Sequence, residues 1–350
     1  ARLGGDEFAI ILPETDLNIA IDVCEKISDR LHGLHFEFEQ VRYSISSSIG
    51  IVPFPLNEFS VDRLLSSADL AMYQAKSLGK DTWHLFTFDD MLGKQLQERM
   101  RWKQKIEDAL SEDRFVLYFQ PIMQIQKQTV SHYEVLLRMQ DEDGQIHSPA
   151  MFIEVAEQSG LIHRIDHYVL EKGIAKLAEL EQQEQTITLS LNLSAHAMLD
   201  AELIPLLKRL LKHYRASPEH LLFELTETAA VADINQARQL MREMRDLGCR
   251  FSIDDFGSGF ASFRYLRELP VDVVKIDGMF ITHITDNNDD KLFVEALVSV
   301  AKGMGKSTVA EFVESAEILA VLAELGVDYA QGYYIGKPQA RLLDGPLKLD

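Results

Sequence analysis

The sequence of 350 residues lacks the features that mark secreted, membrane-spanning and disulfide-stabilised proteins. Its two cysteines, Cys24 and Cys249, cannot build a disulfide framework and do not form a paired metal-binding motif. No apolar run reaches the roughly 18 residues that a transmembrane helix needs, and no signal peptide opens the chain. We therefore expect two free thiols in a reducing, cytoplasmic compartment.

Positive charge is also scarce. The chain has 35 Lys and Arg residues against 55 Asp and Glu residues, which gives a formal net charge of −20. Duplex nucleic acid is held by a basic protein face, so we expect no such partner. A small phosphate ligand needs only one or two cations, and acidic clusters are a common way of holding divalent metals.

The first 88 residues predict a partial α/β domain. Gly4-Gly5-Asp6-Glu7-Phe8 suits a tight hairpin because glycine tolerates positive φ, and a strand is expected at Ala9–Leu12. Helices are predicted over 15–32 and 60–78, with a long strand over 41–52 between them. This unit is small, and the chain begins within a hairpin and without Met. We expect a longer parent that supplies the other half of the domain and could carry a membrane tether.

A linking helix is predicted over residues 89–111, and strands then alternate with helices over 112–350. The predicted strands cover residues 115–120, 130–137, 187–193, 221–225, 250–254, 272–276, 307–311 and 328–330. This rhythm predicts an α/β fold with a TIM-like (β/α)8 barrel. Only residues 123–129 separate the first two of these strands, which is too short for a helical crossover. We therefore expect an antiparallel first strand and a modified barrel.

Polar side chains stand at the ends of successive predicted strands, where a barrel of this kind places its active site. They are Glu134, Asn192, Glu224, Asp254, Asp255, Lys275, Glu311 and Gln331. One acid at a strand end is usually a cap or a solvated group, but a whole series is harder to explain that way. Crowded carboxylates repel unless cations neutralise them, and all-oxygen ligands favour Mg²⁺ or Mn²⁺. The adjacent acids Asp254 and Asp255 suit a pair of ions, the usual arrangement for phosphodiester hydrolysis.

Eight ordered motifs give the chain a family likeness. They are Tyr118-Phe119-Gln120-Pro121, Glu134-Val135-Leu136-Leu137-Arg138, Leu191-Asn192-Leu193-Ser194, Glu224-Leu225-Thr226-Glu227, Asp254-Asp255-Phe256-Gly257-Ser258-Gly259, Lys275-Ile276-Asp277, Ala310-Glu311-Phe312-Val313-Glu314 and Gln331-Gly332-Tyr333. The barrel resembles the EAL-type cyclic di-GMP phosphodiesterases. Residues 1–88, through Gly4-Gly5-Asp6-Glu7-Phe8, resemble the GGDEF (diguanylate cyclase) domain that often precedes them. The resemblance implies metal-dependent hydrolysis of cyclic di-GMP to linear pGpG in bacterial signalling, with a GGDEF remnant that is regulatory or inactive.

The resemblance also implies roles for individual residues. The ligands of two Mg²⁺ or Mn²⁺ ions would be Glu134, Asn192, Glu224 and Asp254 for the first, and Asp254, Asp255 and Glu311 for the second. Lys275 would orient and help activate the attacking water, and Glu311 is open between ligand and general base. Gln120, Arg138 and Gln331 would contact the substrate or the water molecules around it. Glu227 would hold the loop 255–261, and Glu314 would support the ligands from behind.

Two positions depart from the family pattern. Val135 replaces the usual Ala and is expected to do little harm, whereas Phe312 replaces a Gly beside Glu311 and could tilt that carboxylate. Two other functions stay open: a non-catalytic cyclic di-GMP receptor, and a diguanylate cyclase that binds GTP in the intact parent. The chain by itself is expected to make no cyclic di-GMP, because half of that domain is missing. A homodimer through the barrel is implied by the resemblance alone.

Five histidines, His132, His147, His163, His167 and His196, show no evident metal-ligand spacing in the sequence. We expect them to be structural.

Overall fold

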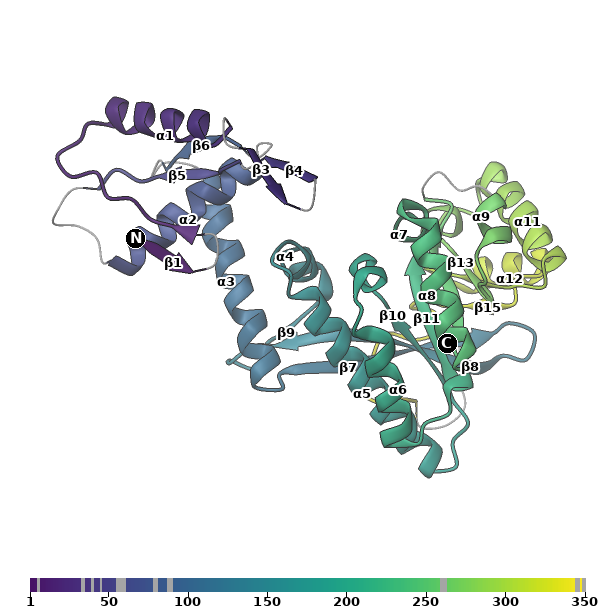
Figure 1. Cartoon of the computed structure of the whole chain (residues 1–350). Coiled ribbons are helices and arrows are strands. Elements are labelled where there is room, and N and C mark those ends of the chain that lie inside the picture. The colour runs from purple at the N-terminus through teal and green to yellow at the C-terminus, as the bar shows by residue number, and fades with distance from the viewer. Residues whose placement is uncertain are drawn as a thin grey trace. The chain divides into compact units, whose positions relative to one another are not determined.

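The structure is a computed structural model that describes residues 1–4, 7–32, 35–38, 41–44, 46–54, 61–77, 81–86, 91–258, 263–343 and 347. The chain divides into two compact units, Ala1–Trp102 and Lys103–Asp350 (Figure 1). The division falls within helix α3 (Met91–Ser111), which lies where the linking helix was predicted. Residues 89 and 90 of that prediction lie outside the described part.

The first unit contains short strands and two helices before α3. Its elements are β1 (Arg2–Gly4), β2 (Glu7–Phe8), α1 (Leu17–His32), β3 (His35–Phe38), β4 (Val41–Ser44), β5 (Ile49–Ile51), α2 (Val61–Ser77) and β6 (Trp83–Leu85). Strands β1 and β2 are antiparallel, as the hairpin prediction requires. Both helices lie where they were predicted, and Leu70, Ala71 and Phe86 form a small core between α2 and the strand β6.

Two strand predictions in this unit are wrong. Ala9–Leu12 is not a strand, and Ile10 and Ile11 are 65% and 75% exposed. A strand is stable when its backbone pairs with a sheet, whereas Ala9 exchanges hydrogen bonds only with Ala1 among the described residues. The single strand predicted over 41–52 is two strands, because β4 pairs with β3 and β5 pairs with β6.

The second unit is a closed barrel of eight strands. They are β7 (Phe115–Gln124), β8 (Thr129–Gln140), β10 (Thr188–Asn192), β11 (Leu221–Thr226), β12 (Arg250–Phe256), β13 (Val273–Ile276), β14 (Ser307–Ala310) and β15 (Tyr329–Ala330). Strand β7 is antiparallel to both of its neighbours, β8 and β15, and β8 closes the barrel by pairing parallel with β10. The TIM-like barrel and its antiparallel first strand are confirmed. A short β9 (Ile146–His147) pairs with β8 and was not predicted.

Helices connect the strands and lie around the barrel (Figure 1). They are α4 (Ile153–Gln158), α5 (Ile162–Gln182), α6 (Leu203–Tyr214), α7 (Glu227–Ala232), α8 (Ile234–Asp246), α9 (Phe263–Glu268), α10 (Gly278–Ile281), α11 (Asn288–Gly303) and α12 (Ala316–Leu325), with short 3-10 turns η1 (Pro149–Met151), η2 (Ala195–Leu199) and η3 (Pro218–His220). Capping residues define where the helices begin and end. At the start of α12 the Ser315 side chain accepts a hydrogen bond from the Ile318 N–H, and Gly326, whose backbone is in the left-handed region, ends the helix. Across the described helices, none is long and apolar enough to cross a bilayer.

Apolar side chains pack on both faces of the barrel strands. Ile122, Leu222, Val273 and Val309 form a buried cluster from four strands. Phe223 and Phe251 alternate with the inward-facing positions and pack on the other face, with ring centroids 5.9 Å apart. Close packing of this kind transmits small displacements from strand to strand. Cys24 and Cys249 are free and buried, and burial raises the pKa of the Cys249 thiol to about 12.

Gly332 marks a close approach of two backbone segments just after β15. A Cβ at this position would lie 2.1 Å from the Val313 carbonyl oxygen. We expect Gly332→Ala to lower the free energy of unfolding by about 1–3 kcal/mol, because the segments must move apart. Urea denaturation measures this. Gly303→Ala is the control, since its Cβ would meet no atom within 4 Å, and it should leave stability unchanged or slightly higher. Equal effects of the two variants would contradict the prediction.

Candidate active site at the mouth of the barrel

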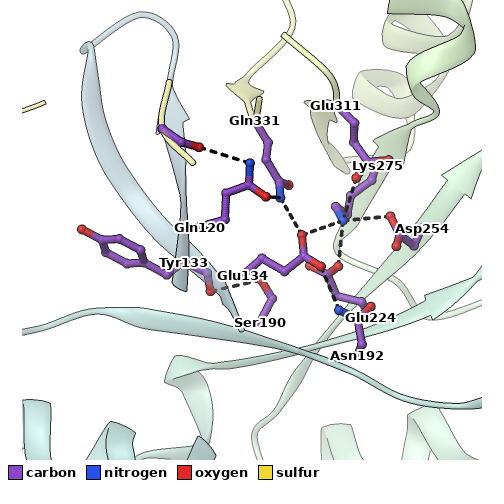
Figure 2. A network of polar contacts seen from close by, with 11 residues as sticks. Gln120, Tyr133, Glu134, Ser190, Asn192, Glu224, Asp254, Lys275, Glu311 and Gln331 are labelled. Carbon is purple, nitrogen blue, oxygen red and sulfur yellow. Dashed lines mark hydrogen bonds and ion pairs between the residues drawn. The ribbon is translucent and has the colours of Figure 1, made fainter. Parts of the chain in front are cut away.

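A buried lysine on β13 is surrounded by carboxylates from four other strands or strand ends (Figure 2). Lys275 Nζ lies 2.8 Å from Glu224 Oε2, 2.9 Å from Asp254 Oδ1, 2.9 Å from Glu311 Oε1 and 3.4 Å from Glu134 Oε2. The lysine is 1% exposed. If all four acids are ionised, one ammonium group leaves three negative charges uncompensated.

Two amide side chains extend this network from Glu134. Asn192 Nδ2 donates to Glu134 Oε1 at 2.8 Å, and Gln331 Nε2 donates to Glu134 Oε2 at 2.6 Å. Gln331 Nε2 also reaches Gln120 Oε1 at 3.2 Å, and Gln120 Nε2 donates to the Gly336 carbonyl (Figure 2). The fold thus brings together polar residues predicted from separate strands.

Burial and neighbouring charge move the pKa values in this cluster in opposite directions. Burial raises the pKa of Glu224 well above its usual value, and it raises that of Glu311 to about 8 against the attraction of Lys275. Burial acts the same way on Glu134, but Lys275 and the amides of Gln331 and Asn192 outweigh it, so that pKa is lowered. The surrounding acids likewise overcome burial and raise the pKa of Lys275.

Three carboxylates form the group best suited to a metal ion. Oxygens of Asp254, Asp255 and Glu311 lie within 4.8 Å of one another. Successive side chains of a regular strand point to opposite faces, yet both aspartates reach this group, because Asp255 has φ 54 and the pairing of β12 with β13 shifts there. Glu224 Oε1 is buried and accepts no hydrogen bond from the described residues. An unfilled buried acceptor within an all-oxygen donor set fits a hard divalent cation.

The other predicted residues differ in how they relate to this network. Glu227, which was predicted to hold the loop 255–261, is buried, and its Oε2 accepts a 2.8 Å hydrogen bond from the Gly257 N–H. Residues 259–261 of that loop lie outside the described part.

Arg138 is on the same face of β8 as Glu134, four residues further along the strand. It donates a hydrogen bond to the Leu137 carbonyl, and its guanidinium lies 5.4 Å from the Tyr118 ring centroid.

Glu314 and Phe312 follow β14 but do not enter the hydrogen-bonded cluster. Glu314 is exposed and shows no polar contact within the described ranges. Phe312 is 59% exposed at φ 52 and its ring lies against Gly278, where an added Cβ would come within 2.3 Å of it. With the ring in this position, Glu311 still reaches Lys275 at 2.9 Å.

The motif that resembles a cyclase signature is described only in part. Gly4 pairs in register with Glu7, and Phe8 is 70% exposed. Gly5 and Asp6 lie outside the described residues.

Two features of the site were not predicted. Lys275 was expected to orient water, but it is also the common counterion of four acids; a lysine within the apolar strand Val273–Ile276 is the signal for that role. Asp166 is buried on the apolar face of α5, where burial raises its pKa to about 6 against hydrogen bonds from Ser194. This contact ties α5 to the segment after Asn192.

Comparison with known proteins gives the family. Residues 103–338 match the family model described as the EAL domain, and residues 1–82 match that of the diguanylate cyclase, GGDEF domain. The chain therefore belongs to the EAL domain family and carries GGDEF-domain sequence before it. The predicted resemblance is confirmed for both parts.

Individual relatives are similar in sequence over much of this chain. Cyclic di-GMP phosphodiesterase PdeB of Shewanella oneidensis is 34% identical over 340 residues, which are 97% of this chain and 40% of PdeB. Cyclic di-GMP phosphodiesterase PdeF of Escherichia coli is 35% identical over 248 residues, 71% of this chain and 33% of PdeF. The chain thus spans well under half the length of these relatives.

Solved structures show the same barrel. The FimX EAL domain from Pseudomonas aeruginosa bound to c-di-GMP has a TM-score of 0.65 and 33% identity, and the match covers 69% of this chain and 97% of that one. The PaMucR phosphodiesterase in complex with c-di-GMP has a TM-score of 0.65 and 29% identity, covering 68% and 97%.

Removing the buried counterion should destabilise the barrel strongly. In the presence of a chelator, Lys275→Met is expected to lower the free energy of unfolding by about 3–5 kcal/mol, because it leaves buried carboxylates uncompensated. The matched control is Lys172→Met, since Lys172 pairs with Asp113 at 2.7 Å on the surface and such pairs contribute about 0–1 kcal/mol. Denaturant unfolding of both variants measures the difference, and similar losses would contradict the view that Lys275 neutralises the cluster.

Proposed function

We propose that this chain hydrolyses one phosphodiester bond of cyclic di-GMP to give linear pGpG. The observation that carries the proposal is the convergence of Glu134, Glu224, Asp254 and Glu311 on Lys275 at the mouth of an EAL-family barrel. Curated relatives that cover most of the chain are named as cyclic di-GMP phosphodiesterases, and two similar structures hold c-di-GMP.

The proposed cofactor is a pair of Mg²⁺ or Mn²⁺ ions. When bound, such ions neutralise charge on the phosphoryl oxygens and make water a stronger nucleophile. The first would be held by Glu134, Asn192, Glu224 and Asp254, and the second by Asp254, Asp255 and Glu311. Support for these assignments is the all-oxygen donor set and the unfilled acceptor Glu224 Oε1.

The chain's own side chains would position the reactants. Lys275 contacts Asp254 and Glu311. It would present an N–H to the attacking water once a metal ion takes over one of its carboxylate contacts, while Glu311 would serve as ligand or as proton acceptor. Arg138 has the fork of donors that suits a phosphate, and it lies beyond Glu134 on β8. Gln120 and Gln331 would complete the shell around substrate and water, and the exposed Glu314 would support the ligands only after a local rearrangement.

The remaining assignments concern the intact parent. We propose a partial GGDEF domain over 1–88, a linking helix over 89–111 and a phosphodiesterase barrel over 112–350. The motif Gly4-Gly5-Asp6-Glu7-Phe8 would be regulatory or inactive here and could bind GTP in the parent. Hydrolysis of a bacterial second messenger would take place in the cytoplasm, and pairing of two barrels would give a homodimer.

Loss of one metal ligand tests the proposal directly. Glu134→Gln keeps the size of the side chain but removes its charge, and we expect pGpG formation in Mg²⁺ to fall by more than about 100-fold. A chelator should abolish the wild-type activity, and Mn²⁺ or Mg²⁺ should restore it. The exposed Glu219→Gln is the control and should retain full activity. Chromatography of the nucleotide products measures each rate, and binding of cyclic di-GMP without any pGpG from the wild type would indicate a receptor instead.

Glu227 provides a test of the loop beside the metal group. Because its carboxylate accepts the Gly257 N–H at 2.8 Å, Glu227→Gln weakens the bond that holds the turn after Asp255. We expect kcat to fall by about 10–100-fold, the range for groups that orient ligands from behind, while the unfolding midpoint changes little. Glu243→Gln on the exposed side of α8 serves for comparison. An unchanged kcat in the Glu227 variant would show that Glu227 does not position this turn for catalysis.

A further inference from the structure

A second cluster of potential metal ligands lies between α5 and the turn η2, which follows β10. His167 Nε2 is 2.6 Å from Asp200 Oδ2, and His163 Nδ1 is 3.7 Å from the same oxygen. The ring of His196 stands edge-on to that of His163, with centroids 5.9 Å apart. Three imidazoles and one carboxylate thus gather outside the Lys275 network.

The sequence contains part of this pattern, although these histidines were expected to be structural. His163 and His167 are four residues apart on α5, so they lie on one face of the helix. Zinc sites use this same spacing of two histidines on a helix. Asp200 and His196 come from the connection after the next strand, and only the packing of η2 against α5 brings them to the pair.

Unpartnered atoms indicate that the cluster is incomplete without a ligand. His163 Nδ1 and His196 Nδ1 are shielded from solvent, and neither has a hydrogen-bond partner in the described part of the chain. Buried polar atoms are normally satisfied, so each exception needs a cause. The other oxygen of the carboxylate, Asp200 Oδ1, already accepts the Glu202 N–H at 2.9 Å. This bond orients the carboxylate and leaves Oδ2 facing the imidazoles.

The cluster is also held in place from outside. Ser194 Oγ donates to Asp166 Oδ2 at 2.5 Å, which fastens the start of η2 to α5 one residue away from His167. Contacts behind the ligands are a usual feature of metal sites, because they fix ligand orientation. The imidazole side chains of His163 and His167 are 38% and 33% exposed, so an ion could reach them from solvent.

We propose that His163, His167 and Asp200 bind one divalent transition-metal ion of the zinc class, with His196 as the fourth ligand. Imidazole nitrogens with one carboxylate are typical Zn²⁺ ligands, unlike the oxygen-only set at the barrel mouth. Bonds of about 2.0–2.2 Å imply tetrahedral ligand separations of roughly 3.3 Å. The observed 2.6 and 3.7 Å lie on either side of that value, but the ligand atoms of the two imidazoles and Asp200 do not all lie within 4.8 Å of one another. Binding therefore requires the His163 and His167 rings to rotate toward each other, together with a rotation of His196.

The test uses the tag-free full chain, stripped of metal and returned to excess Mg²⁺ at pH 7.5, so that hard-cation sites are filled. One equivalent of Zn²⁺ should bind in calorimetry. At free Zn²⁺ of roughly 100 times Kd, Tm should rise by about 5 °C. The double variant His163→Ala/His167→Ala should lose both effects, whereas His213→Ala, which changes an exposed histidine on α6, should keep them.

Co²⁺ supplies a second readout that does not depend on stability. In place of Zn²⁺ it should give the visible absorption bands of a four-coordinate site, and these bands should weaken in Asp200→Asn, which can keep its hydrogen bond to His167. Circular dichroism checks that each variant is folded. The proposal is overturned if Zn²⁺ leaves the wild-type Tm unchanged, or if the folded double variant responds as the wild type does. Either result is independent of whether the barrel hydrolyses cyclic di-GMP.

Discussion

The barrel mouth depends on a single buried ammonium group. Lys275 lies within 3.4 Å of four carboxylates that arrive from different strands. At the effective dielectric typical of proteins, one ion pair at about 4 Å is worth about 4 kcal/mol before desolvation, and like-charge repulsion among the acids opposes it. The strands must therefore hold these side chains in fixed positions, and the close packing of apolar residues on the strands makes that possible. Because one lysine cannot neutralise four ionised acids, the acids either keep protons, as the raised pKa values of Glu224 and Glu311 indicate, or take up further cations.

The regular backbone geometry of the strands is interrupted directly after two of the acids that contact Lys275. Asp255 at φ 54 follows Asp254, and Phe312 at φ 52 follows Glu311. Non-glycine residues in this region cost energy, and they persist where surrounding contacts enforce them. At Asp255 the enforcing contact is visible, since Glu227 binds the Gly257 N–H in the next turn. The departure places two consecutive acids in one group, which an unbroken strand could not do. The strained backbone at Asp255 in β12 is thus what places two neighbouring carboxylates where a metal ion could bind both.

Much of this architecture could be predicted from the sequence, and the errors have identifiable causes. The strands and the reversed β7 follow from apolar runs and one short connection, which are local signals. The polar strand ends followed from the same pattern, since a barrel brings them to one mouth. The bulge at Asp255 could not be predicted, because it depends on pairing between β12 and β13. His167 and Asp200 meet only through packing of η2 on α5. At Ala9–Leu12 an apolar run predicted a strand, but no described strand pairs with it.

Electrostatics then constrain the order of events under the proposed activity. Cyclic di-GMP carries two negative phosphodiesters, and without added cations the acids around Lys275 would repel them. Repulsion of this kind is strongest where water is excluded, and the acids are buried. Arg138 supplies one compensating charge. It donates to the Leu137 carbonyl, lies against the Tyr118 ring and is attracted by the charge of Glu134. Divalent ions bound at the mouth would offset this repulsion. The excess of acid over base would then make nucleotide binding stronger when metal is present.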